Sequence, residues 1–339
     1  MLQQPLPITA RCSIKLRPKH ELRAACDGPP FFTHMTFAIN SEVAMTDHSP
    51  LAASDELLAY VPPADLDDAY ENSAYIPGAK SWLETLPDRA AAFRAGRPQA
   101  ALDQPYGKSE RQRYDLFTPE GDAEATRGML AIVHGGYWMA LSKDDFSHLA
   151  AGPLARGWAV AMIGYTLAPQ ARIAEITAEI AAATNAVADL GSGPLRLAGH
   201  SAGGHLVARM MCQDVVLSAK AAARLDRVVS VSGLHDLRPL RRLAKNSTWQ
   251  LDDNEAAAES PVMRMPREGI ALACIAGAAE RPEFIRQNAL LPLAWQGLGT
   301  PACSSLLAGD HHFSVIDHLA DAGSSLCDAA CAPSLAPES

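Results

Sequence analysis

Residues 199–203 combine a nucleophile with the small neighbours that a sharp turn requires. They read Gly-His-Ser-Ala-Gly, follow a short apolar run that ends at Ala198, and lead at once into a segment of helical pattern. In a G-x-S-x-G turn between a strand and a helix, the glycines let the flanking backbones pass, and the serine hydroxyl projects above the sheet. The backbone N–H of Ala202 and the start of the helix would face the group that the serine attacks. We therefore expect Ser201 to be a nucleophile and Ala202 to donate to the resulting oxyanion.

Residues 134–138 form a second loop suited to the same chemistry. They read His-Gly-Gly-Tyr-Trp and come directly after another apolar run. Two adjacent glycines remove side chains, so that backbone N–H groups can turn toward a substrate oxygen beside a nucleophile elbow. We expect the N–H groups of Gly136 and Tyr137 to complete an oxyanion hole with that of Ala202. For His134 we expect only hydrogen bonds that brace the loop.

A serine needs a base to accept its proton, and the chain offers two neighbouring candidates. In a fold with this type of elbow the order along the chain is serine, then an acid, then histidine, which restricts the search to residues after Ser201. Residues 309–314 read Gly-Asp-His-His-Phe-Ser and follow the last apolar run of the series. We expect His311 or His312 to be the base, and position alone does not choose between them.

The acid that orients this base should come from the loop after the preceding strand. Glu280 stands just past the apolar run at 270–276, whereas Glu283 opens the next helical segment, where an acidic residue favours the helix dipole. Asp236 follows an earlier strand and is the alternative. The ordering rule favours Glu280 over Asp236.

These loops have to be positioned by a regular alternation of strands and helices. Short apolar runs predict buried strands, and segments of 3.6-residue period lie between them. The expected strands are 111–117, 129–133, 158–163, 195–198, 227–231, 270–276 and 303–308, and the expected helices are 144–156, 172–190, 202–213, 283–297 and 314–326. Such alternation predicts an α/β fold with a mostly parallel sheet and helices on both faces. Residues 237–268 break the rhythm, and we expect them to form a lid over the ends of the strands.

The two ends of the chain differ from this central part. Residues 1–44 follow neither the helical nor the strand period, so we expect a disordered N-terminal extension. Residues 45–326 are expected to form one α/β domain that includes the lid. Residues 327–339 are expected to be a flexible tail.

Composition narrows the class of partner. The chain has 339 residues, of which 48% are hydrophobic, and a formal charge of −9 with a pI near 5.6. This acidity disfavours nucleic acid and anionic membrane surfaces as partners. The seven cysteines are scattered without C-x-x-C spacing, and no apolar stretch is long enough to span a membrane, so we expect a cytoplasmic protein. No residues have metal-ligand spacing, and we expect no metal and no cofactor.

Four motifs together resemble the kynurenine formamidase (arylformamidase) group of α/β-hydrolases. They are His-Gly-Gly-Tyr-Trp at 134–138, Gly-His-Ser-Ala-Gly at 199–203, Gly-x-x-Glu-x-Pro-Glu-Phe-x-Arg-Gln at 277–287, and His312-Phe313. The first is the most distinctive, because related esterases and lipases usually carry other residues after the glycines. The resemblance covers residues 64–322. It departs at Glu280, where vertebrate and fungal members have aspartate.

The resemblance implies a mechanism and a substrate class. Carried over by position, it implies Ser201 as nucleophile, Glu280 as acid and His312 as base of a cofactor-free hydrolase. The implied reaction is cleavage of the N-formyl amide of an arylamine, with N-formyl-L-kynurenine as substrate and formate as product. We expect the aromatic group to rest against Tyr137, Trp138 and Trp249, although any of these could equally belong to the core.

Two other functions fit the same residues. A general carboxylesterase acting on small acyl or aryl esters would use the same triad. A non-catalytic member of the fold that binds a ligand is less well supported, because every position of the triad is filled. The sequence leaves the oligomeric state open, with a homodimer as one option.

Overall fold

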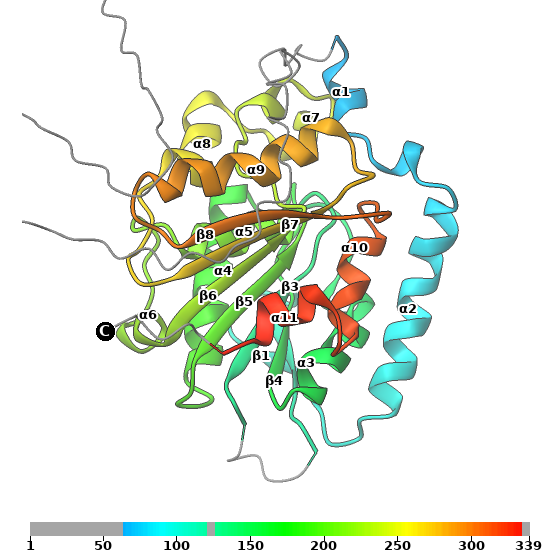
Figure 1. Ribbon diagram of the computed structural model, residues 1–339, viewed down its shortest axis with the longest axis vertical. Helices are drawn as coiled ribbons and strands as arrows, with labels where there is room; N and C mark the ends of the chain where they lie inside the picture. The colour runs from blue at the N-terminus through cyan, green and yellow to red at the C-terminus, as the bar shows by residue number, and fades with distance from the viewer. Residues whose placement is uncertain (1–63, 121–125, 334–339) are drawn as a thin grey trace, which may run out of the picture. The chain divides into compact units, whose positions relative to one another are not determined.

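A mostly parallel sheet forms the centre of the computed structural model, which describes residues 64–120 and 126–333. The eight-stranded sheet has the order β1-β2-β4-β3-β5-β6-β7-β8 (Figure 1). The strands are β1 (Ala101–Pro105), β2 (Arg113–Phe117), β3 (Met129–Val133), β4 (Ala159–Ile163), β5 (Leu195–His200), β6 (Leu225–Val231), β7 (Ala271–Gly277) and β8 (Ala302–Leu307). The β1–β2 and β2–β4 pairs are antiparallel, and the other pairs are parallel. The expected α/β class is confirmed, and the extension at 1–44 lies outside the described residues.

Helices cover both faces of this sheet because its central strands are apolar on both sides. In β3, Met129, Ala131 and Val133 pack into one core, and Leu130 and Ile132 pack into the other. The helices are α1 (Leu66–Ala69), α2 (Ala79–Ala95), α3 (Ala151–Ala155), α4 (Ile173–Ala188), α5 (Ala202–Met210), α6 (Ala219–Arg224), α7 (Asn246–Trp249), α8 (Asp253–Ala258), α9 (Pro282–Gln296), α10 (Ser314–Asp317) and α11 (Ser325–Cys331). Figure 1 shows α10 and α11 in front of the strands. Within the described residues, no helix combines the length and the hydropathy of a membrane span.

The parallel register brings the carboxyl ends of the strands to one edge of the sheet. Val133 at the end of β3 is the partner of Gly199 near the end of β5. At the other side of the sheet, Gly277 of β7 is the partner of Leu307 of β8. The loops that follow β3, β5, β6, β7 and β8 therefore leave the sheet at the same edge, where open α/β sheets bind their ligands.

The helix expected at 144–156 is shorter than the sequence pattern indicates. Two 3₁₀ turns, Lys143–Asp145 and Ser147–Ala150, come first, and only α3 is α-helical. Pro153 explains the late start, because proline has no N–H and is accommodated only in the first turn of a helix.

The segment expected as one helix at 314–326, followed by a flexible tail, is also different. The chain forms α10, a 3₁₀ turn at His318–Ala320 and then α11, with a break at Asp321 and Gly323 where the Asp321 carboxylate accepts the Gly323 N–H. In α11 the residues Leu326, Cys327, Ala330 and Cys331 are buried. The predicted tail boundary at 327 is therefore wrong, because these apolar residues pack against the sheet as far as Cys331.

Residues 237–268 form a compact segment of short helices rather than regular α/β units. It contains α7, α8 and two 3₁₀ turns, Pro239–Arg242 and Pro261–Met263. Trp249 of α7 is almost fully buried, and its indole N–H donates to the carbonyl of Tyr137 at 2.7 Å. The segment therefore contacts the loop that follows β3.

Candidate active site

The turn after β5 holds Ser201 in a strained conformation. Its φ of 55° and ψ of −116° lie outside the regions that non-glycine residues usually adopt, which costs about 1–3 kcal/mol. The flanking glycines are required by space: a Cβ on Gly199 would lie 2.2 Å from the carbonyl oxygen of Gly203, and one on Gly203 would lie 2.1 Å from that of Val133. The Ser201 N–H donates to Val231 at 2.8 Å, which fixes the turn to the end of β6. Such strain at a serine is typical of a nucleophile elbow.

The loop after β3 lies directly beside this serine. A Cβ added to Gly135 would be 3.2 Å from the Cβ of Ser201, so only glycine lets the two loops approach so closely. Gly136 and Tyr137 have positive φ values of 104° and 51°. Among the described residues, no acceptor takes up the backbone N–H of Gly136, Tyr137 or Ala202. The three N–H groups expected to form an oxyanion hole are thus unused, and two of them lie in a loop whose conformation is unusual.

His134 supports the same loop from within the protein. Its Nδ1–H donates to the carbonyl of Gly135 at 2.8 Å, and its ring stacks on that of Tyr165 with centroids 4.2 Å apart. Burial lowers the pKa of His134 to about 3, so the imidazole is neutral. It braces the loop, as the sequence analysis expects.

Glu280 and His312 form a buried acid–base pair at the carboxyl ends of β7 and β8. The Nδ1–H of His312 donates to Glu280 Oε2 at 2.7 Å, and both side chains are almost completely buried. The other carboxylate oxygen accepts the N–H of Gly277 at 2.7 Å and the hydroxyl of Ser232. Burial acts to raise the pKa of Glu280, but His312 and these two donors outweigh it and lower the pKa below its ordinary value.

This geometry also fixes the tautomer of His312. A carboxylate that stays ionised can only accept hydrogen bonds, so the proton of the neutral imidazole must be on Nδ1. Nε2 of His312 then carries a lone pair. The pair is therefore arranged as in a hydrolase in which the acid orients a general base.

The structure gives different partners to the two neighbouring histidines that position along the chain does not separate. His311 Nδ1 accepts the backbone N–H groups of Phe313 and Ser314, at 3.2 and 3.1 Å, and so supports the turn before α10. The alternative acid is engaged elsewhere, because the carboxylate of Asp236 is held by the guanidinium of Arg238 at 2.7 Å. Neither His311 nor Asp236 contacts the Glu280–His312 pair through any hydrogen bond of the described residues.

The aromatic residues expected to contact a substrate do not share one environment. Trp138 and Trp249 are 0% and 1% exposed, and their rings meet edge to face with centroids 5.7 Å apart. Both belong to the core under the loop after β3, which corrects the expectation that they touch the substrate. Tyr137 is partly exposed, with its hydroxyl on the carbonyl of Tyr70, and is the one of the three that remains accessible.

Sequence reasoning did not assign three residues that complete the site. Ser232 has a φ of 52° and gives its hydroxyl to Glu280; a Ser-Gly pair directly after a strand was the available signal. Tyr70 joins α1 to α9, because its hydroxyl donates to Glu283 at 2.8 Å. His200 is the third, and no signal in the sequence separates it from other residues in the second position of a G-x-S-x-G turn.

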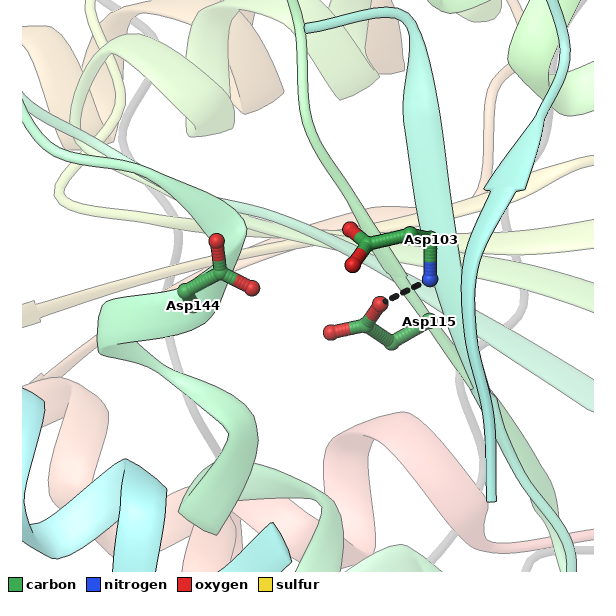
Figure 2. A group of neighbouring side chains, drawn as sticks. All are labelled: Asp103, Asp115 and Asp144. Atoms are coloured by element: carbon green, nitrogen blue, oxygen red, sulfur yellow. Dashed lines mark hydrogen bonds between the residues drawn. The ribbon is translucent and has the colours of Figure 1, made fainter.

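A second group of carboxylates lies at the antiparallel end of the sheet, where β1 and β2 meet the turn Lys143–Asp145. Asp103, Asp115 and Asp144 have oxygens within 4.8 Å of one another, as a metal site would require (Figure 2). However, the ammonium of Lys143 lies among them, at 2.8 Å from Asp103, 2.8 Å from Asp115 and 2.7 Å from Asp144. A lysine therefore occupies the position that a cation would take.

The stretch from β3 into α9 matches a known family model. The model is described as the α/β hydrolase fold and matches residues 130–285, which include Gly136, Ser201 and Glu280. The chain is also 26% identical over 230 residues to a protein from Danio rerio named kynurenine formamidase. That match covers 66% of this chain and 78% of the relative.

Solved structures extend this similarity. A protein from Silicibacter sp. TM1040, provisionally named a thioesterase, is 45% identical with a TM-score of 0.75. The match covers 79% of this chain and 99% of that chain. Esterase B from Lactobacillus rhamnosis is 18% identical with a TM-score of 0.55, over 73% of this chain and 88% of its own, and shares the fold alone.

Proposed function

We propose that this chain, which belongs to the α/β-hydrolase family, is a serine hydrolase whose triad is Ser201, His312 and Glu280. The observation that carries the proposal is the buried hydrogen bond of 2.7 Å from His312 Nδ1 to Glu280. It leaves His312 Nε2 as a base on the edge of the sheet that also presents the strained Ser201. A serine at its ordinary pKa needs such an oriented base to become a nucleophile.

The reaction would follow from these roles in two stages. Ser201 Oγ attacks the acyl carbon while His312 Nε2 takes the hydroxyl proton, and the ionised Glu280 stabilises the imidazolium. The N–H groups of Gly136, Tyr137 and Ala202 hold the oxyanion; removal of one such donor in this type of site costs about 3 kcal/mol of transition-state stabilisation. His312 then gives its proton to the leaving nitrogen or oxygen, which leaves an acyl-enzyme. Water activated by the same imidazole releases the acid.

We infer that the substrate is the N-formyl amide of an arylamine, with N-formyl-L-kynurenine as the first candidate. Relatives from three animals carry the name kynurenine formamidase at 25–26% identity. Tyr137, a partly exposed residue whose ring stacks on that of Trp249, is the aromatic residue that we expect beside the leaving group.

A carboxylesterase acting on small acyl or aryl esters is the second candidate. The structure that is 45% identical carries a thioesterase name, and several structural neighbours are esterases. The same triad would cleave an activated ester as readily as an activated amide.

The deciding experiment compares kcat/KM of the purified chain on N-formyl-L-kynurenine, p-nitrophenyl acetate and a p-nitrophenyl thioester, with Ser201→Ala as the control. The formamidase proposal predicts efficient release of kynurenine, at a rate comparable to or above that for the esters. An ester preferred by several orders of magnitude would support the second candidate. Hydrolysis that survives in Ser201→Ala would contradict both.

A further inference from the structure

The side chain of His200 connects the turn after β5 to the loop after β8. It is the last residue of β5, next to Ser201, and it is buried. Its Nε2 lies 2.8 Å from the backbone carbonyl oxygen of His312, and its ring centroid is 4.7 Å from that of His312. Because a carbonyl only accepts, the proton must be on Nε2 of His200. One imidazole therefore connects the nucleophile turn to the loop of the base.

The opposite side of the same ring faces the loop after β3. A Cβ added to Gly135 would lie 3.0 Å from His200 Nδ1. This nitrogen is buried and has no hydrogen-bond partner among the described residues. His200 thus separates Gly135 from the His312 loop and determines how closely the two approach Ser201.

The environment keeps this imidazole uncharged. Burial lowers the pKa of His200 to about 3, and a charge on His312 acts in the same direction. The ring therefore remains a neutral Nε2–H donor at any pH at which the protein would work. A second cation beside His312 would oppose the imidazolium that forms when the serine attacks.

We propose that His200 is a positioning residue for the reaction: its Nε2–H holds the backbone of His312 so that the base keeps its place beside the turn that carries Ser201. The inference rests on the proposed serine mechanism. It assigns to His200 a role in the chemical step rather than in substrate binding, because the ring acts through the carbonyl of His312. Misplacement of a catalytic group by about 1 Å can cost about 100-fold in rate.

His205 provides a matched control within the same chain. It is also fully buried, its Nε2–H donates to a backbone carbonyl, that of Glu259, at 2.7 Å, and its Nδ1 has no partner among the described residues. Burial lowers the pKa of His205 to about 3 as well. The two histidines differ in the loop that they hold, since Glu259 belongs to the segment 237–268 and not to the triad.

The test compares His200→Met, His200→Gln and His205→Met in the full chain, with kcat and KM measured on the best substrate found. Methionine fills the space without a donor, and the glutamine amide can donate at a similar reach. We expect His200→Met to lower kcat about 30-fold with KM changed less than about 3-fold. His200→Gln should recover kcat to within about 5-fold of the unmodified chain, and His205→Met should leave kcat within about 2-fold.

Each other result overturns the assignment. If His200→Met keeps its kcat, or if Gln and Met are equally impaired, the hydrogen bond to His312 does not position the base. If His205→Met loses kcat equally, the effect is a general loss of core packing. Failure of the serine mechanism is separate, because activity would then survive in Ser201→Ala.

A measurement on the unmodified chain keeps the proposal testable if the His200 variants do not fold. Nitrogen-15 NMR of the histidine side chains at pH 6 should show His200 as a neutral ring with its proton on Nε2. An imidazolium, or a proton on Nδ1, would overturn the proposal, because neither state matches a ring held in this way.

Discussion

Two clusters, each built around a buried ionisable side chain and lying at opposite ends of the strand order, use similar residues for different purposes. In the Lys143 cluster (Asp103, Asp115, Lys143 and Asp144), an ammonium meets three carboxylates at 2.7–2.8 Å. Each of its three N–H groups already has an acceptor, so none is left for another partner. Burial acts to lower the pKa of Lys143, but the carboxylates outweigh it and raise the pKa. This cluster holds β1 and β2 to the turn that contains Lys143.

In the Glu280 cluster (Ser232, Gly277, Glu280 and His312), one nitrogen of His312 has no hydrogen-bond partner among the described residues. Both oxygens of the carboxylate accept hydrogen bonds, but His312 uses only its Nδ1–H and keeps a lone pair on Nε2. Strained backbone occurs near both clusters, at Ser201 and Ser232 here and at Asp103 in the Lys143 cluster, so it does not separate them. The difference teaches that a buried charge alone does not mark a catalytic site. A site for chemistry also needs a group with unused hydrogen-bonding capacity.

The substitution with the largest expected effect on activity is Ser201→Ala. We expect kcat/KM to fall by about 10⁴-fold or more, because the nucleophile is lost and only the oxyanion donors and binding remain. Thermal unfolding should change little, since the removed hydroxyl is not needed for the turn. Steady-state kinetics and calorimetry check both expectations, and a variant that is unfolded rather than inactive would leave the site to be tested by His312→Ala.

The next effect separates the two adjacent histidines. His312→Ala should lower kcat by about 10⁴-fold, because the base and the partner of Glu280 disappear together. His311→Ala removes only an acceptor for the turn before α10 and should change kcat less than about 5-fold. Paired kinetics on the two variants check this expectation. The reverse order of severity would show that the base is His311.

A falling pH should lower the free energy of unfolding, because several buried imidazoles have no carboxylate as a hydrogen-bond partner. Burial lowers the pKa to about 3 in His134, His200 and His205 and to about 4 in His235. These pKa values are depressed in the folded state, so below pH 6.5 the unfolded chain binds more protons. Each histidine then removes about 1.4 kcal/mol of the free energy of unfolding per pH unit as the pH falls toward the folded pKa.

The lowered pKa of Glu280 acts in the same sense, since its contribution is present above the unfolded pKa and is lost as the pH falls. Urea unfolding at pH 7, 6 and 5 checks the sign. We expect the midpoint to fall steeply below pH 6.5. An unchanged midpoint at pH 5 would mean that these rings are charged or exposed.

Lys143→Met tests the other cluster, which we expect to affect stability and not catalysis. It leaves Asp115 buried beside two other carboxylates without their shared cation, and we expect the free energy of unfolding to fall by about 3 kcal/mol. The kcat of the folded fraction should not change, because the cluster is not part of the site. Asp144→Asn removes an exposed partner and should cost less than about 1 kcal/mol. A loss of kcat in folded Lys143→Met would show that the two clusters are coupled.

Much of the site could be predicted because its demands are local. In the turn after β5, Gly199 is required because a Cβ would collide with Gly203, four residues further along the chain. The collisions at Gly135 are with His200 and Ser201 of a distant segment, so that glycine could be predicted only from the motif. The strands could be predicted from apolar runs that pack on both sides. The order of serine, acid and histidine then followed from the class of fold.

The remaining features depend on contacts between distant segments. His311 and His312 occupy one loop, and only the direction of Glu280 from β7 distinguishes them. Trp138 and Trp249 are aromatic residues of the kind that often contact ligands, but their rings pack against each other in the core. The order of α11 arises from residues that find partners only after the sheet has formed, so no periodicity of the tail could reveal it.

Covalent labelling tests the central claim most directly. The chain is treated with a fluorophosphonate, and intact mass and peptide mapping are followed together with residual activity. We predict one adduct, on Ser201, formed in proportion to the activity lost and absent from Ser201→Ala. A chain that hydrolyses its substrate at full rate while Ser201 stays unmodified, or that is inactivated by an adduct elsewhere, would contradict the account.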